Sequence, residues 1–323
     1  MKPNSTVILL ALGLLAYCRA MRADPYTYVT IDEPGSYFTR AYGINGSDQI
    51  VGSVNFTRGV LPTHGFIYAN GAFTNFDFPS ATLTEPHAIN NVGQIVGSYS
   101  GVHGFLYAGG TFTAIDDPNA IGGSGFTDAT GINDSGTIVG YYFAPNSNGI
   151  GGSFSGFIYS NGTFQTINVP GANDSEAIGI NNAGQIVLNS GLGGFLYTNG
   201  VFTPIQVPGA FQTSVTAINN VGQIGGMFSG SKDFLFVDSG GVFTTFEGPS
   251  GAGDFRGIND QGEIVGSYNP LGTPFVLGFL GTPTPEPASR LLCFCGLAVA
   301  GIAIGRQRNQ SVGLQRGRKE IAS

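Results

Sequence analysis

The apolar residues of this chain recur in short alternating runs, and the runs recur as a set. Residues 88–99 read AINNVGQIVGSY, and related Ile-Asn phrases begin near residues 43, 131, 179, 217 and 257. Aligned on the Asn of Ile-Asn, the six copies are spaced 45, 43, 48, 38 and 40 residues apart. A repeat of this length indicates an architecture in which each copy is one supersecondary unit.

Each copy predicts about four short β-strands, and none shows a helical period. One strand ends at Ile-Asn, a second follows a tight turn, and a third carries Gly-Phe-x-Tyr, as at residues 65–68. A turn such as Asn70-Gly71 then opens the last strand, because both residues of such a hairpin turn need positive φ. Four strands in about 40–45 residues is typical of one blade of a β-propeller.

The two ends of the repeat region predict how the ring closes. Residues 26–36 match the last strand of a repeat with nothing before it, and Gly278–Leu280 match the preceding strand with nothing after it. Pairing Tyr28–Asp32 with Phe279 would complete a sixth blade and leave no exposed edge. We therefore predict an all-β, six-bladed propeller over residues 24–282. The alternative is a seventh blade within the irregular residues 119–155.

Charge and cysteine content exclude several functions for this body. Residues 24–282 contain 18 Asp and Glu against four Lys and Arg, a balance of 4 − 18 = −14. A body this acidic repels phosphate backbones, so we expect no nucleic-acid partner. The cysteines are Cys18, Cys293 and Cys295, all outside the body, which excludes a thiolate metal site or a Cys nucleophile there.

The N-terminus predicts export. Lys2 precedes an apolar run over Val7–Tyr17, and small residues follow at Ala20 and Ala23. This is the layout of a secretory signal peptide, here residues 1–23, cleaved after either alanine. A lipoprotein signal ending at Cys18 is the weaker alternative, because bulky Tyr17 stands where a small residue is needed.

The C-terminus has three parts. A Pro-rich linker at 283–290 contains Pro285, Glu286 and Pro287, an apolar transmembrane helix follows at 291–305, and a basic tail with Arg306 and Arg308 fills 306–323. Fifteen helical residues rise roughly 22 Å, less than the roughly 30 Å hydrocarbon core. The arginines would hold the tail on the cytoplasmic side.

This order of motif, helix and basic residues resembles the PEP-CTERM sorting signal of Gram-negative bacteria. The resemblance implies cleavage near Pro-Glu-Pro by an exosortase, a membrane protease, and delivery to the cell surface or an exopolysaccharide matrix. Two cysteines in the helix and a long tail after Arg308 depart from the pattern, so an ordinary membrane anchor is the alternative. The repeats themselves, Gly-Ile-Asn-x-x-Gly-x-Ile-Val-Gly followed by His-Gly-Phe-x-Tyr, resemble HAF-type extracellular repeats, which implies secretion and assigns no activity.

No catalytic, metal or cofactor site is predicted. The sequence holds no H-x-x-x-H, G-x-S-x-G or P-loop pattern. His64 and His103 share one repeat position, and His87 stands where other repeats have Tyr, Thr, Ile or Arg, so the repeat merely permits these histidines. The repeated Asn and Asp residues are explained by turn capping.

A ligand face is expected where the period breaks, at residues 116–128 and 143–155. There Asp128, Phe143, Asn146 and Asn148 could offer stacking and amide contacts to a carbohydrate; a Gly/Ser loop without function is the simpler interpretation. We predict a non-enzymatic protein, exported across the inner membrane and transiently anchored in it. At the surface it would bind matrix polymer or surface proteins. The alternative is a glycosidase or lyase acting on exopolysaccharide, with acidic residues such as Asp128, Asp174 and Glu176 converging at one end of the channel.

Overall fold

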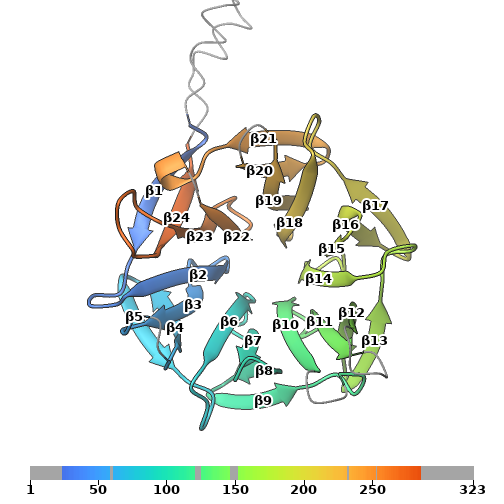
Figure 1. Ribbon diagram of the computed structural model, residues 1–323, viewed down its shortest axis with the longest axis horizontal. Helices are drawn as coiled ribbons and strands as arrows, with labels where there is room; N and C mark the ends of the chain where they lie inside the picture. Colours follow the sequence, from blue (N-terminus) through green and yellow to red (C-terminus); the bar gives the residue numbers. More distant parts are fainter. Residues whose placement is uncertain are drawn as a thin grey trace, which may run out of the picture. The chain divides into compact units, whose positions relative to one another are not determined.

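Six antiparallel four-stranded sheets surround a common centre in the computed structural model, like the blades of a propeller (Figure 1). The structure describes residues 24–58, 61–120, 125–145, 152–230, 233–251 and 253–284. Within these ranges the only helix is one 3₁₀ turn, η1 at Pro249–Gly251. The predicted all-β, six-bladed propeller is therefore confirmed.

Each of the first five blades is one continuous stretch of chain whose strands run in order from the centre to the rim. Blade one holds β2 (Phe38–Ile44), β3 (Ile50–Asn55), β4 (His64–Ala69) and β5 (Ala72–Phe76); blade two holds β6 (Thr84–Ile89), β7 (Ile95–Tyr99), β8 (His103–Ala108) and β9 (Thr111–Ile115). Blade three holds β10 (Phe126–Ile132), β11 (Ile138–Pro145), β12 (Gly152–Ser160) and β13 (Thr163–Ile167). Blade four holds β14 (Ser175–Ile180), β15 (Ile186–Ser190), β16 (Gly193–Thr198) and β17 (Val201–Ile205); blade five holds β18 (Gln212–Ile218), β19 (Gln223–Ser229), β20 (Asp233–Ser239) and β21 (Val242–Phe246).

Blade six joins the two ends of the repeat region. It contains β22 (Asp254–Ile258), β23 (Ile264–Tyr268) and β24 (Leu277–Pro283), and its outermost strand is β1 (Tyr26–Ile31), in the order β1-β24-β23-β22. The ring of Tyr28 meets that of Phe279 edge-on at 5.5 Å. The predicted closure is thus confirmed, and the seventh blade is excluded, since the described part of residues 119–155 belongs to blade three.

By internal contacts the chain forms two compact units, of which Thr27–Pro283 is the propeller. The other unit holds the chain ends, and only its residues 24–26 and 284 are described. The predicted signal peptide, sorting motif, apolar helix and basic tail lie outside the described residues. No helix within the described ranges is long and apolar enough to cross a membrane.

The repeated Ile-Val-Gly-Ser phrase packs each blade in two directions. Its valine is fully buried against the following blade in five of the six copies: Val51, Val96, Val139, Val187 and Val265. The next residue lies against the Phe ring of its own blade in four copies, where it is Gly52, Gly140, Gly226 or Gly266; blade four has Leu188 at this position. A Cβ on Gly140, for example, would meet the Asp128 carbonyl at 2.0 Å and the Phe157 ring at 2.8 Å. Glycine is needed there by close packing, not by turn geometry.

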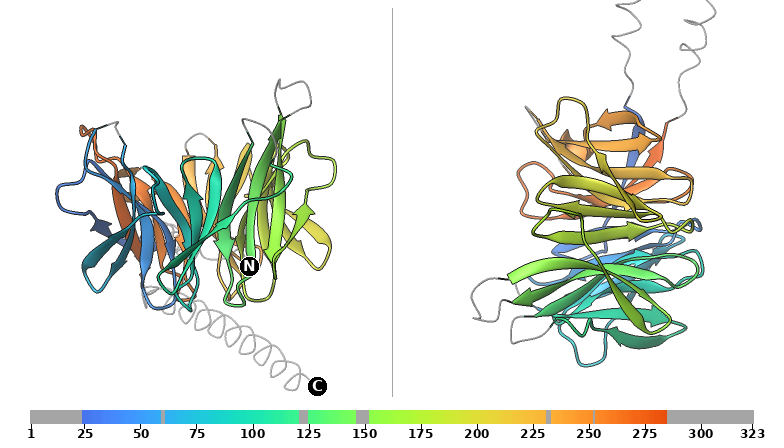
Figure 2. Two further views of the ribbon diagram at one scale, coloured as in Figure 1. Left: turned by 90° about the horizontal axis from the view of Figure 1, so that it is seen from below. Right: turned by 90° about the vertical axis from the view of Figure 1, so that its right-hand side faces the viewer.

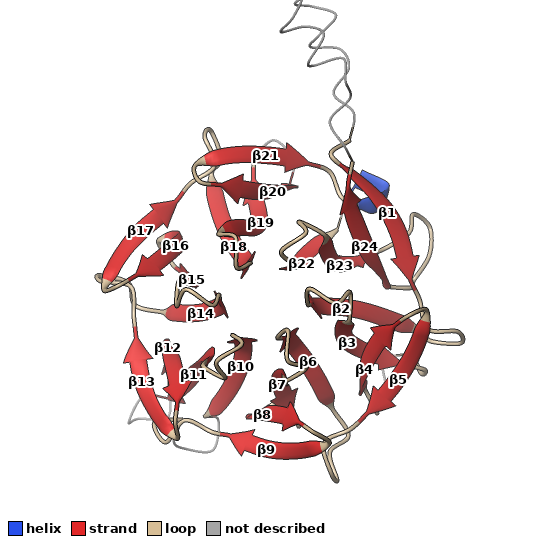
Figure 3. Cartoon of the chain, turned by 180° about the vertical axis from the view of Figure 1, so that it is seen from behind, coloured by secondary structure: helices blue, strands red, loops and turns tan. Residues whose placement is uncertain are grey.

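The strand order separates constant from variable parts of the repeat. Because the strands alternate in direction, the Ile-Asn turns and the Asn-Gly turns lie at the same end of the propeller. Figure 3 shows the turns that join the two innermost strands of each blade around the centre. The connections between second and third strands, and the crossings from blade to blade, lie at the opposite end (Figure 2). These connections differ in length and composition, so we call this second end the loop face.

Candidate functional site

The turn end of the central channel is closed by a ring of six asparagines. The side-chain amide of each Ile-Asn asparagine donates to the backbone carbonyl of the equivalent asparagine in the next blade, at 2.8–3.4 Å: Asn45, Asn90, Asn133, Asn181, Asn219 and Asn259. Each side-chain oxygen also accepts backbone N–H groups of its own turn, as Asn45 does from Ser47 and Gln49 at 3.0 Å. The asparagines are nearly fully buried, and a cavity of only about 70 Å³ remains beside them.

A second chain of bonds lies outside this ring and is open at one point. The residue after each ring asparagine accepts a backbone N–H from the preceding blade at 2.8 Å, through Asn91, Asp134, Asn182, Asn220 and Asp260. Blade one has Gly46 at this position and offers no side chain. These contacts explain the repeated Asn and Asp residues as structural, in agreement with the turn-capping interpretation.

A β-bulge interrupts every innermost strand at the same place. The register skips one residue per blade, and the six skipped residues surround a cavity of about 90 Å³ in the middle of the channel: Tyr42, His87, Thr130, Ile178, Thr216 and Arg256. Bulges re-aim side chains, and here they present six chemically different groups to one space. The constant repeat thus carries a variable set of side chains at its centre.

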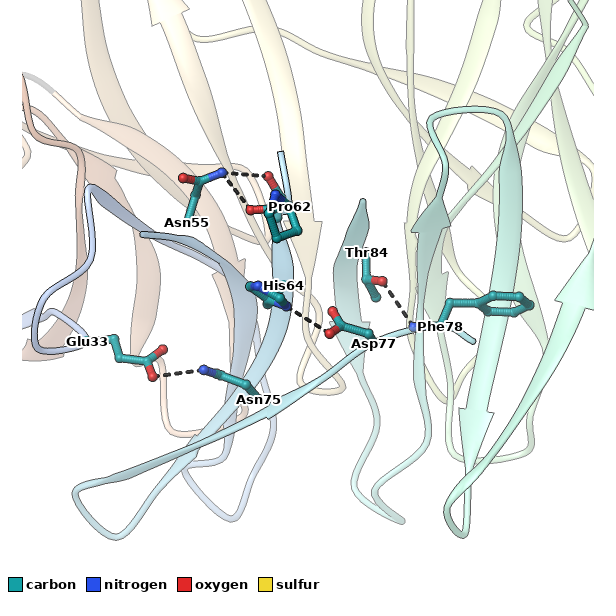
Figure 4. A network of polar contacts seen from close by, with 9 residues as sticks. Glu33, Asn55, Pro62, His64, Asn75, Asp77, Phe78 and Thr84 are labelled. Carbon is teal, nitrogen blue, oxygen red and sulfur yellow. Dashed lines mark hydrogen bonds and ion pairs between the residues drawn. The ribbon is translucent and has the colours of Figure 1, made fainter. Parts of the chain in front are cut away.

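The crossings between blades carry a hydrogen bond that blade six lacks. A hydroxyl at the start of the innermost strand accepts a backbone N–H from the preceding crossing, as Thr84 does from Phe78 at 3.0 Å (Figure 4). The same bond recurs at 2.9–3.1 Å with Thr39, Thr127, Ser175 and Thr213, all buried. In blade six the corresponding positions are both glycine, Gly248 and Gly253.

The missing side chains coincide with a cavity of about 960 Å³. It opens at the loop face between blades five and six and reaches Arg40 and Tyr42 of blade one. The blade interface below it is also atypical, since blade five has Gly225 where other blades have the buried valine, and the Phe255 ring fills that space. The cavity therefore forms where the sequence departs from its own repeat.

The cavity wall combines cationic, aromatic and polar groups. Arg40 and Arg256 contribute charge, Tyr42 and Tyr268 contribute rings, and Gln212 contributes an amide. The Arg40 guanidinium lies 4.6 Å above the Phe38 ring, and that of Arg256 lies 5.9 Å from the Tyr42 ring. Aromatic rings with a few convergent polar groups are the usual lining of ligand pockets.

Across the channel, His87 and Asp128 form an ion pair between blades two and three. His87 Nε2 lies 3.1 Å from Asp128 Oδ1, with 22% and 16% of the two side chains exposed. Burial acts against both charges, yet the mutual attraction outweighs it, so the pKa of His87 is raised and that of Asp128 is lowered. Tyr141 donates to Asp128 Oδ2 at 3.1 Å, and burial raises the pKa of Tyr141 strongly.

This pair does not form a Ser-His-Asp triad. Ser98 Oγ also approaches His87 Nε2, at 3.3 Å, so acid and hydroxyl share one ring nitrogen. A triad needs them on opposite nitrogens. Within the described residues there is also no group of three His, Cys, Asp or Glu side chains that could hold a metal ion.

The acidic residues named for the enzymatic alternative are only partly brought together. Burial, together with the charges of Asp174 and Asp128, raises the pKa of Glu176. Glu176 and Asp128 are therefore electrostatic neighbours at the loop face. Asp174 instead accepts the backbone N–H of Phe154 at 2.9 Å, a structural contact.

Phe143 belongs to a strand, which corrects the interpretation of residues 143–155 as a Gly/Ser loop. β11 and β12 extend to Pro145 and Gly152, and Phe143 pairs with Phe154 in register. Its ring packs on Phe126 at 5.9 Å and on Phe154 at 5.3 Å. The alternation of aromatic and small residues favours a longer hairpin. Asn146 and Asn148 lie outside the described residues.

The remaining histidines contact carboxylates at the rim. In blade one, His64 Nδ1 lies 2.8 Å from Asp77 Oδ2 (Figure 4). In blade two, His103 Nδ1 lies 3.1 Å from Asp116 Oδ1. Both pairs are partly exposed to solvent and occupy equivalent positions in blades one and two. Each pair therefore joins the third strand of its blade to the segment that crosses to the next blade. The same view shows Asn75 donating to Glu33 at 2.9 Å.

Arg40, Tyr42 and Arg256 are not among the site residues expected from the sequence. Tyr42 and Arg256 do carry a signal, because the residue three before each ring asparagine changes chemistry from copy to copy. In the sequence alone this variability argues against function, since the spacing does not reveal the bulge that turns the position into the channel. Arg40 lies outside this position and carries no such signal.

Comparison with known proteins finds likeness of fold only. No protein-family profile matches the chain, and no curated protein sequence does. Among solved structures, the β-propeller domain of the Trilobed protease from Pyrococcus furiosus is similar at TM-score 0.45 and 10% identity, covering 79% of this chain and 97% of that one. Two further solved structures are similar. One is an arginine-substituted mutant of AofleA from Arthrobotrys oligospora (TM-score 0.40, 11% identity, covering 81% of this chain and 94% of that one), and the other is the fucose-recognising six-bladed β-propeller lectin of Aleuria aurantia (TM-score 0.35, 12% identity, covering 71% and 80%).

Proposed function

We propose that this protein is an exported, non-enzymatic propeller that binds matrix polymer through the cavity at its loop face. The observation that carries the proposal is the cavity of about 960 Å³ at the one crossing where Gly248 and Gly253 replace the repeated side chains. A site produced by a departure from the repeat is a better candidate than any group the repeat itself requires.

The destination follows from the two chain ends. The N-terminal apolar run supports export, and Pro285-Glu286-Pro287 with Arg306 and Arg308 supports recognition by an exosortase-type protease and release to the surface or matrix of a Gram-negative cell. The membrane contact would then be transient, through residues 291–305.

Two experiments test the two halves of this proposal. A glycan array probed with the full-length protein should show binding to extended polysaccharides, and an empty array would refute the polymer-binding half. Replacing Pro285–Pro287 by alanines should abolish surface delivery and leave the C-terminal mass unprocessed. Unchanged localisation and mass would refute the sorting half without affecting the first.

A polysaccharide hydrolase or lyase remains the second candidate, favoured by the raised pKa of Glu176 beside Asp128. A carboxyl group whose pKa is raised by burial and by neighbouring carboxylates is suited to act as a general acid. Incubation with a panel of polysaccharides, followed by mass spectrometry of the products, would show shortened chains that disappear in Glu176→Gln. Intact polysaccharides throughout would remove this candidate.

A further inference from the structure

We infer that the loop-face cavity takes an acidic saccharide, in which isolated carboxylates alternate with neutral sugars, and that Arg40 and Arg256 hold one carboxylate. The inference rests on the proposed function, because it names the class of polymer for the same site. It is argued from charge, from how the two arginines are held, and from the rings around them.

The side chains that line the cavity carry a net charge opposite in sign to that of the body around it. Residues 24–282 contain four Lys and Arg against 18 Asp and Glu, and two of those four cations line this cavity. Only one carboxylate, that of Asp254, lines it with them. The wall therefore has a formal balance of 2 − 1 = +1, within a body whose balance is 4 − 18 = −14. Such a placement favours an anionic ligand at this point and nowhere else in the described channel.

The two arginines are held differently. Arg40 is half-buried over the Phe38 ring at 4.6 Å, and no carboxylate of the described residues pairs with it. Arg256 contacts Asp254 at 3.1 Å, and more than a third of each side chain is exposed. The ring contact leaves the N–H donors of Arg40 without a carboxylate acceptor among the described residues. The Arg40 fork is thus the group most in need of a carboxylate, which guanidinium binds through two parallel hydrogen bonds.

The surrounding groups fit a sugar. Tyr42 and Tyr268 present half-buried rings, and the Tyr268 hydroxyl is fixed by a 2.9 Å hydrogen bond with Thr30 Oγ1. Gln212 and Ser214 add an amide and a hydroxyl at the same wall. Apolar ring faces beside neutral donors and acceptors match the alternating CH and OH surfaces of a pyranose, and they match an acidic peptide less well.

The net charge limits how acidic the polymer can be. At physiological salt, a body at −14 repels a densely charged polyanion wherever the two surfaces come within about 8 Å of each other. A polymer with one carboxylate per two sugars places a single charge in the cavity and keeps its other charges spaced along the chain. The site is therefore suited to sparse carboxylates and not to nucleic acid or heavily sulfated glycans.

Isothermal titration calorimetry of the full-length protein tests this inference. The probes are the hyaluronan hexasaccharide and the unsulfated chondroitin hexasaccharide, each beside its carboxyl-reduced form, which differs only in the replaced carboxylates. Both acidic probes should bind more tightly than their reduced forms, and the difference should shrink as salt is added. Arg40→Gln should weaken acidic binding about tenfold or more, equivalent to about 1.4 kcal/mol, and Arg40→Lys should restore part of it. Arg58→Gln, an exposed arginine outside the cavity, is the matched control and should bind as the wild type does.

The outcomes separate this inference from the proposed function. If reduced and acidic forms bind equally and Arg40→Gln changes nothing, the carboxylate assignment is overturned while polymer binding stands. If neither acidic hexasaccharide binds but an acidic peptide does, the saccharide class is overturned as well. A glycan array with no signal removes both.

Discussion

The side-chain amide of Asn259 donates a hydrogen bond to the backbone carbonyl of Asn45, 214 residues earlier in the chain, at 3.4 Å. This bond joins blade six to blade one and completes the ring of asparagines at the turn end of the channel. The seam between the chain ends is thus closed twice, at the centre by this bond and at the rim by β1 on β24.

Replacing Asn259 by Ala should destabilise the whole propeller. The change removes the bond to Asn45 and leaves the partly buried backbone N–H groups of Gln261 and Glu263 without their acceptor. Each unsatisfied buried group costs roughly 1–3 kcal/mol, so we expect a loss of about 3 kcal/mol in the free energy of unfolding. Urea denaturation measures it, with Asn75→Ala, which loses one exposed contact, as control. Equal midpoints for the two variants would contradict a role of the ring in stability.

Gly140→Ala should be equally damaging for a different reason. Its Cβ would lie 2.0 Å from the Asp128 carbonyl and 2.8 Å from the Phe157 ring, neither of which has room to move. Overpacking of this kind costs about 1–3 kcal/mol. Gly191→Ala, where no atom lies within 4 Å of the new Cβ, should change the free energy of unfolding by less than about 0.5 kcal/mol. Thermal unfolding of both variants decides whether the glycine is needed for packing.

The His87–Asp128 pair predicts a pH window of extra stability. The folded pKa of His87 is raised above 6.5, so its contribution is complete below that pH and is lost as pH rises through the folded value. The folded pKa of Asp128 is lowered below 3.8, so its contribution is present above that pH and is lost as pH falls further. Wild type should therefore exceed His87→Gln in melting temperature most between about pH 4 and 6.5. A difference that does not vary with pH would show that the pair contributes no charge interaction.

The fold was predictable because the same turn and strand motifs recur in every copy of the repeat. Asn-Gly turns, the Ile-Val-Gly phrase and the half-hairpins at residues 26–36 and 278–280 each have one geometric consequence, and these agree on six closed blades. The seam was predictable for the same reason, since β1 supplies the strand that blade six lacks.

The site was less predictable because it depends on small local departures from the repeat. The side chain of His87 turns into the channel because of a β-bulge. The pairing register of the strands reveals this bulge, but the spacing of residues in the sequence does not. Gly248 and Gly253 look like ordinary loop residues until the other five crossings show a hydroxyl bond there. Phe143 was expected in a Gly/Ser loop and lies in a strand instead, because the Gly/Ser-rich stretch concealed how far β11 and β12 pair.

The most direct test of the account is Gly253→Thr, which returns to blade six the side chain that the other blades carry. Its Cβ meets nothing closer than the Ser267 carbonyl at 3.3 Å, so the melting temperature should change little while the added atoms narrow the cavity. Calorimetric titration with the glycan that binds wild type best should then show affinity lowered about tenfold or more, and Gly191→Thr on the same face should bind normally. Unchanged affinity in a well-folded Gly253→Thr protein would contradict the claim that this cavity is the binding site.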